Sequence, residues 1–243
     1  DGRVRDVAAS GTVNSALGAL NPRGFAMNAE PPGKRALLDA AERLAGSSRC
    51  LTSLGLRELA REAGLNPNTF YRHFRDMEDL GLQLLRQSKD ELRAALRALR
   101  RQAAGAVEQG AGEAGVSKGR AVCRQTLRLY FDYVYANRAR VLIAVRELHG
   151  PSPALRLELQ RQMDEFADDM AQDIHELGLM PPLVSASQVR RIAGMVNRNM
   201  LFQSLDYLGE PARRSEILAL AEDQVMMLFT GAVTLQQRGD LRS

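Results

Sequence analysis

The segment that most constrains the fold is residues 55–74, which predicts two short helices joined by a tight turn. Apolar residues of its first half recur at i, i+3, i+4 and i+7, the spacing of one helix face: Leu56, Leu59, Ala60 and Ala63. Gly64 stands where glycine commonly ends a helix, because it adopts positive φ without a Cβ penalty. Asn66 and Pro67 then supply an N-cap and a first helical residue. The segment is therefore a helix-turn-helix.

The second helix of this motif has an apolar side and a polar side. Phe70 and Phe74, four residues apart, are expected to anchor it inward. The other residues point outward or along the rim: Pro67, Asn68, Thr69, Tyr71, Arg72 and His73. Such a mixture can hydrogen-bond base edges, contact thymine methyl groups and bind phosphates. A solvated helical hairpin would show the same spacing, so the pattern alone leaves both readings open.

Positive charge is concentrated around this motif. Residues 34–104 carry fourteen Lys or Arg against nine Asp or Glu, whereas residues 105–243 carry sixteen against seventeen. A local excess of this kind favours attraction to phosphate. Arg57 is a candidate phosphate ligand, and so are Lys34 and Arg35, which oppose the dipole of the first predicted helix; solvent exposure explains the last two equally well.

Residues 54–85 resemble the DNA-binding domain of the TetR-type transcriptional repressors. In that family a helix of the form Leu-Arg-Glu-Leu-Ala-Arg-Glu-Ala-Gly precedes a recognition helix containing Thr-Phe-Tyr-Arg-His-Phe. The resemblance implies that Thr69, Tyr71 and His73 contact double-stranded operator DNA. It also marks a departure, because Gly55 occupies an N-cap where the family usually has Ser or Thr that can touch phosphate.

Composition predicts an all-α protein. Leucine, alanine and arginine dominate the 243 residues, Trp is absent and aromatic residues make up 5%. Four helices are expected before a glycine-rich loop at residues 105–119, the first from Pro32 to about Ala45 and the fourth from about Met77 to Ala104. Five more are expected after it, at about 120–136, 138–149, 153–177, 187–208 and 212–237. Nine helices is the number that the resemblance implies.

The predicted organisation has three parts. Residues 1–26 lack helical periodicity and are interpreted as a disordered upstream or expression-derived segment, residues 27–80 as the DNA-binding domain, and residues 81–243 as a ligand-binding and dimerisation domain. No apolar run approaches the roughly 20 residues that cross a bilayer, so we expect a cytoplasmic protein without membrane association. Cys50 and Cys123 are expected to be ordinary reduced thiols, and neither a metal site nor a cofactor is indicated.

The second domain contains a candidate ligand pocket. Nine apolar or aromatic residues are expected on inward helix faces: Tyr130, Phe131, Val134, Met163, Phe166, Met170, Ile174, Met195 and Met200. Methionine adapts to flexible apolar ligands, although the same stripe would suit an ordinary core. Arg146, in a polar cluster with Glu147 and His149, could meet an anionic head group or form a structural salt bridge.

Residues 141–156, Val-Leu-Ile-Ala-Val-Arg-Glu-Leu-His-Gly-Pro-Ser-Pro-Ala-Leu-Arg, are similar to the corresponding region of the repressors of unsaturated fatty-acid synthesis. The segment Phe-Tyr-Arg-His-Phe-Arg-Asp is similar to that subgroup as well. This resemblance implies a long-chain acyl-CoA effector and control of unsaturated acyl-chain genes. The alternative is a TetR-type regulator of efflux or catabolic genes that senses a different apolar ligand.

The last two predicted helices carry apolar residues over wide faces. They could lie centrally in a monomer, or form a four-helix bundle across the two-fold axis of a homodimer, as the resemblance implies. The candidate interface residues are Ile192, Val196, Ile217, Leu220, Val225, Leu228 and Phe229. A homodimer would suit a palindromic operator.

Two other classes of function compete with a ligand-responsive repressor. An enzyme could use His149 with Glu147, or His175 with Glu176, but the sequence has no Gly-x-Ser-x-Gly, His-Glu-x-x-His or phosphate-binding glycine loop. A helical scaffold for another protein would bind no DNA. We therefore expect a regulator and not an enzyme.

Overall fold

The computed structural model describes residues 30–47, 49–109 and 116–241, so the prediction for residues 1–26 lies outside the described residues. Within these ranges the chain forms nine α-helices and two 3₁₀ turns, η1 (Leu51–Ser53) and η2 (Pro211–Arg213). The helices are α2 (Pro32–Ser47), α3 (Leu56–Glu62), α4 (Pro67–Phe70), α5 (Met77–Gln109), α6 (Val116–Ala136), α7 (Arg138–Leu148), α8 (Pro153–Glu176), α9 (Ala186–Gly209) and α10 (Arg214–Gln237). The predicted all-α, nine-helix fold is confirmed.

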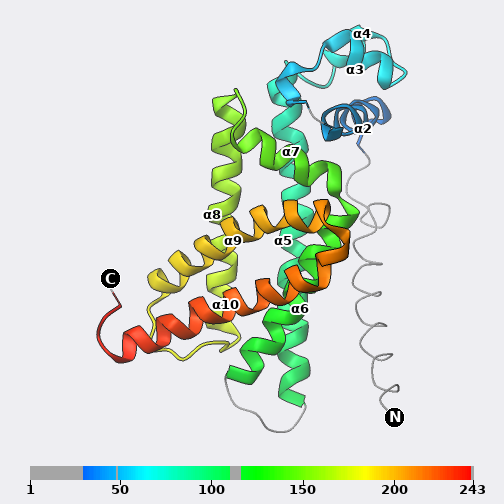
Figure 1. Ribbon diagram of the computed structural model, residues 1–243. Helices are drawn as coiled ribbons and strands as arrows, with labels where there is room; N and C mark the ends of the chain where they lie inside the picture. Colours follow the sequence, from blue (N-terminus) through cyan, green and yellow to red (C-terminus); the bar gives the residue numbers. More distant parts are fainter. Residues whose placement is uncertain (1–29, 48, 110–115, 242–243) are drawn as a thin grey trace.

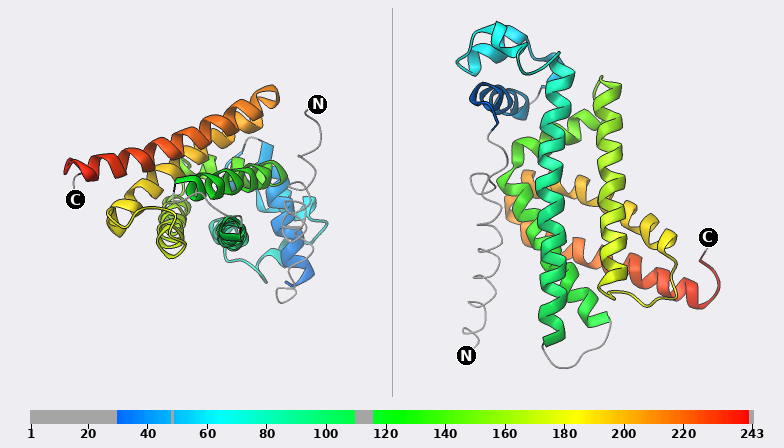
Figure 2. Two further views of the ribbon diagram at one scale, coloured as in Figure 1. Left: turned by 90° about the horizontal axis from the view of Figure 1, so that it is seen from below. Right: turned by 180° about the vertical axis from the view of Figure 1, so that it is seen from behind.

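The helices form a small head and a larger body (Figure 1). The head consists of α2, α3 and α4, and α7 lies directly beneath it. Helix α5 begins in the head and runs along the body beside α6 and α8, whereas α9 and α10 cross these helices on one side (Figure 2). Because α5 has 33 residues, it is about 50 Å long at 1.5 Å per residue. A single rigid element therefore links the two parts.

The turn between α3 and α4 is closed by a Schellman motif. Gly64 has φ +68°, the Leu65 N–H donates to the Ala60 carbonyl at 2.9 Å, and the Gly64 N–H donates to the Arg61 carbonyl at 3.1 Å. Asn66 caps the next helix, since its side-chain oxygen accepts from the Asn68 N–H at 2.9 Å. Local turn chemistry thus fixes the angle between the two helices.

Gly64→Ala should lower the free energy of unfolding by about 1 kcal/mol, because an L side chain is strained at this φ. No neighbouring atom lies within 4 Å of the added Cβ, so backbone strain alone should set the cost. Gly105→Ala is the matched control, since that glycine lies inside α5 with equally open space around it. There alanine should stabilise the helix by roughly 0.5–1 kcal/mol. Urea denaturation measures the change in the free energy of unfolding for both variants. A change of the same sign in both would contradict the strained, positive-φ conformation assigned to Gly64.

Helix α5 is longer than predicted. Its start agrees with the sequence, because the Asp76 side chain accepts from the Asp79 N–H at 2.8 Å as an N-cap. The expected loop at residues 105–119 is wrong at both ends, since α5 continues to Gln109 and α6 begins at Val116. The middle of that loop, residues 110–115, lies outside the described residues. One glycine costs a helix only about 1 kcal/mol, and packing of α5 against α6 offsets it.

Ion pairs connect α5 with α8 along most of their shared length, and we call this set the α5–α8 ladder. The pairs and their N–O distances are Arg86–Glu158 (3.2 Å), Lys89–Glu165 (3.0 Å), Arg93–Asp169 (2.6 Å), Arg97–Asp169 (3.4 Å), Arg100–Asp173 (2.6 Å) and Arg101–Glu176 (3.7 Å). Residue numbers rise together on both helices, so the helices run parallel (Figure 1). The ladder therefore fixes the register of the helix that carries the head.

Helices α9 and α10 pack on each other and on α6, but only partly. Four of the predicted interface residues are already buried inside this chain: Ile192, Val196, Ile217 and Val225. Their assignment to a dimer interface is wrong, because they form the core between α6, α9 and α10. Leu228 and Phe229 are half-buried against the same core, and Leu220 is exposed. The apolar side chains that do face outward are Met195, Phe202, Leu220, Met227 and Leu235.

Helix α10 also corrects the expectation about apolar runs. Residues Pro211–Gln237 are long and apolar enough to cross a membrane by length and composition, with a mean hydropathy of 1.3 and 22% of the best window buried. No other described helix meets this test. Length and composition alone do not distinguish a helix that crosses a membrane from one that packs on another protein surface.

Candidate nucleic-acid interface and internal cavity

The second helix of the head presents its polar side to solvent. Helix α4 is a single turn, and residues Tyr71 to His73 continue it as hydrogen-bonded turns, so the recognition helix is shorter than expected. Phe70 and Phe74 are buried, as predicted. Asn68 and Arg72 are exposed, and 66% of Tyr71 is exposed. The ring of Tyr71 packs edge-on against the buried ring of Phe70, with 5.5 Å between the ring centroids. This contact orients the exposed phenol group.

The start of α2 lies against this recognition segment. A Cβ built on Gly33 would lie 3.1 Å from His73 Nε2 and 3.5 Å from a Thr69 methyl carbon. Arg35 is exposed, whereas Lys34 forms an ion pair with Glu30 at 3.0 Å. A phosphate at Lys34 would therefore have to displace Glu30. The basic start of α2 and the recognition segment form one continuous surface.

Helix α3 starts without a side-chain cap. Gly55 has φ −78° and makes no side-chain hydrogen bond, as its residue type requires. The carboxylate of Glu58 pairs with Arg49 at 2.6 Å, and the Arg49 hydrogen bond, together with a backbone hydrogen bond from Gly55, lowers the pKa of Glu58. Arg57 is exposed beside them. The predicted basic contacts Arg35 and Arg57 are thus accessible, and Arg49 is held by Glu58.

Arg146 and Glu147 join the head to the body. Arg146 Nη1 donates to the Ala45 carbonyl at 2.6 Å and to the Arg49 carbonyl at 2.9 Å, which caps the C-terminal end of α2. Glu147 is fully buried, and its Oε1 accepts from the Leu51 N–H at 2.6 Å. Assignment of Arg146 to the ligand pocket is therefore wrong, and the salt-bridge alternative also fails, since its partners are carbonyl groups.

The two His/Glu pairs of the enzyme hypothesis receive no support from this geometry. Burial raises the pKa of Glu147, and its second oxygen has no hydrogen-bond partner among the described residues. Glu176 accepts from Gln172 at 2.7 Å and lies near Arg101. No group of three or more His, Cys, Asp or Glu side chains that could hold a metal occurs in the described ranges. These carboxylates have structural roles.

An apolar cavity of about 330 Å³ lies between α5, α6, α7, α8, α9 and α10. This volume is at the lower end of the roughly 300–1,000 Å³ typical of small-molecule sites. The cavity is elongated, because its lining extends along α5 from Leu84 to Arg100, about 24 Å at 1.5 Å per residue. It also follows α8 from Leu159 to Ile174. One end lies beneath the head and the other at the far end of the body.

The structure brings most of the predicted pocket residues to this cavity. The residues that line it are Tyr130, Val134, Met163, Phe166, Met170, Ile174 and Met200. Phe131 and Met195 do not line it, which corrects the prediction. Phe131 is buried against Tyr207 between α6, α9 and α10, with ring centroids 4.6 Å apart. Met195 lies on the outer face of α9 and is 56% exposed.

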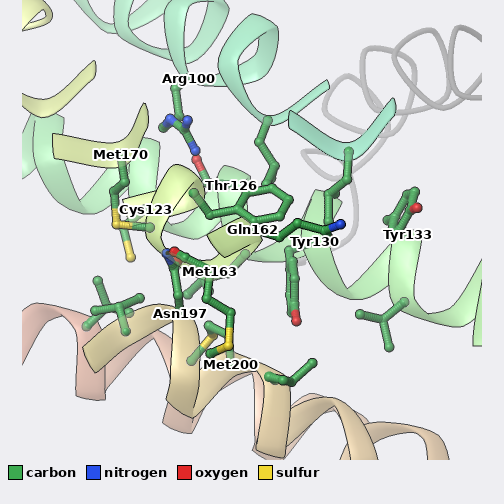
Figure 3. A pocket seen from close by; sticks show the side chains of 18 of the residues that line it. Arg100, Cys123, Thr126, Tyr130, Tyr133, Gln162, Met163, Met170, Asn197 and Met200 are labelled. Carbon is green, nitrogen blue, oxygen red and sulfur yellow. Dashed lines mark hydrogen bonds between the residues drawn. The ribbon is translucent and has the colours of Figure 1, made fainter. Parts of the chain in front are cut away.

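The polar residues of the lining were missed from the sequence. Arg100, Thr126, Gln162 and Asn197 surround the same space as the methionines (Figure 3). The lining also includes Lys89 and Arg140, but no Asp or Glu among the described residues. These positions look like solvated helix residues in the sequence, and only the packing of α5 on α8 reveals that Arg100 is buried.

Cys123 lines the cavity as well, in an environment that disfavours the thiolate. Burial is the main cause that raises the pKa of its thiol to about 12, and Glu222 adds to the effect. Cys50 and Cys123 are both free of disulfides. Since the thiolate is the reactive species, burial lowers the reactivity of the Cys123 thiol at neutral pH.

Comparison with known proteins identifies the head. Residues 37–84 match the model of "Bacterial regulatory proteins, tetR family", a range that contains α3, α4 and the turn between them. An uncharacterised HTH-type transcriptional regulator of Haemophilus influenzae is 32% identical over 202 residues, which cover 82% of this chain and 89% of that protein. The chain belongs to the tetR family. It is a DNA-binding transcriptional regulator, as the head's sequence predicted.

Solved structures extend the likeness of this tetR-family regulator to the body. The fatty acid degradation regulator FadR of Bacillus halodurans aligns with a TM-score of 0.61 at 14% identity, over 84% of this chain and 98% of that one. FadR of Bacillus subtilis in complex with stearoyl-CoA aligns with a TM-score of 0.57 at 14% identity, over 81% and 98%. At such identities the likeness establishes a shared fold for head and body together.

Proposed function

We propose that this regulator is a homodimeric repressor that binds a palindromic operator and is controlled by a long-chain acyl-CoA. The exposed recognition segment supports operator binding. Asn68 and Thr69 would reach bases, Tyr71 would contact a base or a phosphate, and Arg35, Arg57 and His73 would bind phosphates. A regulator that acts on bacterial genomic DNA would work in the cytoplasm.

The outward face of α9 and α10 supports the dimer. Phe202 follows Met195 by seven residues on α9, and Met227 follows Leu220 by seven on α10, which places each pair on one helix face. The two helices are neighbours (Figure 2), and we infer that these exposed side chains share one apolar surface. A second copy related by a two-fold axis would cover it as a four-helix bundle, and this accounts for the exposed apolar helix without a membrane.

Met227→Glu should dissociate the dimer, because it would bury an unpaired carboxylate in the proposed dimer interface. Met227 is 62% exposed in the single chain, so the variant should keep its helical circular dichroism. Sedimentation velocity should show at least a tenfold weaker self-association. Leu157→Glu, at an equally exposed position on α8, is the matched control and should leave the dimer intact. If the Met227→Glu variant remains dimeric, the outward face of α9 and α10 is not the dimer interface.

The shape and charge of the cavity support a long acyl effector. An extended alkyl chain advances about 1.25 Å per bond, so chains of 16 to 18 carbons span about 19 to 21 Å. A contact distance of about 4 Å at the chain end brings this to the length of about 24 Å along the lining. Among the described residues the lining contains Lys89, Arg100 and Arg140 but no Asp or Glu, and the carboxylates that pair with these cations do not line the cavity. Such a lining offers no counter-ion to a lipophilic cation. The relative in complex with stearoyl-CoA has the same fold. The alternative is a regulator of efflux or catabolic genes that senses a different apolar ligand, and these observations favour an acyl chain over a cationic ligand of that class.

One experiment in two steps tests the proposal. Sheared genomic DNA is selected on the purified protein, and we expect enriched fragments with two half-sites about one helical turn apart. The affinity for that operator is then measured with and without palmitoyl-CoA, with a lipophilic quaternary ammonium compound as the control ligand. We expect at least a tenfold change with palmitoyl-CoA only. Lack of enrichment would refute operator binding, and an unchanged affinity would refute the acyl effector alone.

A further inference from the structure

The cavity ends at the hydrophobic core of the head. Six of its lining residues belong to the cluster that also contains Leu37, Leu51 and Phe70 of the head. The shared residues are Leu84, Leu85, Ile143, Ala144, Leu148 and Leu159. We call them the head-side wall. Since packed interiors transmit small displacements, a ligand that presses on this wall acts directly on the packing of α2 and η1.

The opposite end of the cavity offers one polar anchor. Arg100 is 5% exposed, and its Nε and Nη2 both lie 2.6 Å from Asp173 Oδ2. These contacts with Asp173 use Nε and Nη2 and leave Nη1 outside the pair, on a residue that lines the cavity. Because the carboxylate of Asp173 already neutralises the guanidinium, a neutral carbonyl oxygen suits this position better than an ionised group.

We propose that the cavity measures the length of an acyl chain between Arg100 and the head-side wall. The carbonyl of the chain accepts a hydrogen bond from Arg100, and the chain extends along α5 towards the head. Chains of 16 to 18 carbons span about 19 to 21 Å and come within the contact distance of about 4 Å of a wall about 24 Å away. Chains of 8 or 12 carbons span only about 9 or 14 Å and end short of it. Short chains therefore occupy the cavity without altering the head.

This inference rests on the proposed acyl effector and adds the rule by which one chain length is distinguished from another. The binding site and the responding site share residues, so no separate relay is needed between them. A ligand changes DNA affinity only through its different interaction with the two states of the head, and contact with the wall provides that difference.

The test uses the full chain with CoA thioesters of 8, 12, 16 and 18 carbons. Calorimetry measures binding, and amide hydrogen exchange of residues 37–59 reports on the head. We expect every thioester to bind, and those with 16 and 18 carbons to change head exchange at least threefold. Equal responses at all lengths would overturn the length rule while leaving the acyl effector in place. Absence of binding by all four would overturn both.

A substitution at the wall sharpens the test. Ala144→Leu adds three carbons at the head side of the cavity and should lower the shortest active chain by about two carbons. Ala136→Leu is the matched control, because Ala136 is exposed at the end of α6 and does not line the cavity. An unchanged threshold in a folded Ala144→Leu variant would refute the inference. If that variant does not fold, the chain-length series of the original protein decides.

Discussion

Tyr71→Ala is expected to weaken operator binding by about 10- to 100-fold without unfolding the head, given that a good side-chain contact to DNA contributes about 1–3 kcal/mol. The side chain is two-thirds exposed, and its loss removes only an edge contact with Phe70 from the protein itself. Fluorescence anisotropy on the selected operator measures the affinity. Tyr135→Ala, an equally exposed tyrosine on α6 in the body, is the matched control.

The salt dependence of the same variants separates two roles of this surface. Arg35→Ala should lower the slope of log affinity against log salt by about one, because it removes one phosphate contact. If Tyr71 contacts a base, Tyr71→Ala should leave this slope unchanged. The variant should then lose more affinity for the operator than for random DNA. Tyr71→Ala that binds the operator as tightly as the original protein would refute the recognition assignment.

Arg100→Ala should lower the free energy of unfolding by about 3–5 kcal/mol, because it leaves the carboxylate of Asp173 buried without its closest partner. Asp173 is fully buried, and its other nearby cation, Arg97, lies 3.8 Å away. The double variant Arg100→Leu with Asp173→Leu should lose far less, since it removes both charges and keeps the volume. Urea denaturation at one fixed protein concentration measures both.

The neighbouring residue provides a control for this prediction. Arg101 pairs with Glu176 at 3.7 Å on the exposed edge of the α5–α8 ladder, where both side chains remain in water. Arg101→Ala should therefore cost at most about 1 kcal/mol. If Arg100→Ala lowers the free energy of unfolding no more than Arg101→Ala does, the prediction is wrong. Removal of one partner would then cost no more in the buried Arg100–Asp173 pair than in an exposed pair.

Local sequence signals predicted the head well. Gly64, Asn66 and Pro67 specify the turn through their own backbone preferences, and these preferences act within a few residues. The pairing of the basic residues of α5 with the acidic residues of α8 could not be predicted in this way. Their partners lie more than 70 positions away, and each helix alone resembles an ordinary solvated helix.

The sequence also did not predict which faces of α9 and α10 are buried within the chain. Both helices are apolar over wide faces, so several faces compete for burial. The structure buries Ile192 and Val196 within the chain and turns Met195 outward. A wide apolar face indicates that a helix has two neighbours, but the sequence does not say which side belongs to the chain itself and which to a partner.

The joint between head and body limits how this regulator can be re-engineered. The predicted boundary at residue 80 cuts through a shared core, because Leu155 and Ile143 pack in the same cluster as Leu59. Gly46 also lies so close to α7 that a Cβ there would be 2.8 Å from the Cβ of Ala139. A chimaera that fuses this head to a foreign body would expose part of the head's interior. An exchange that keeps this interior covered has to carry Ile143 and Leu155 along with the head.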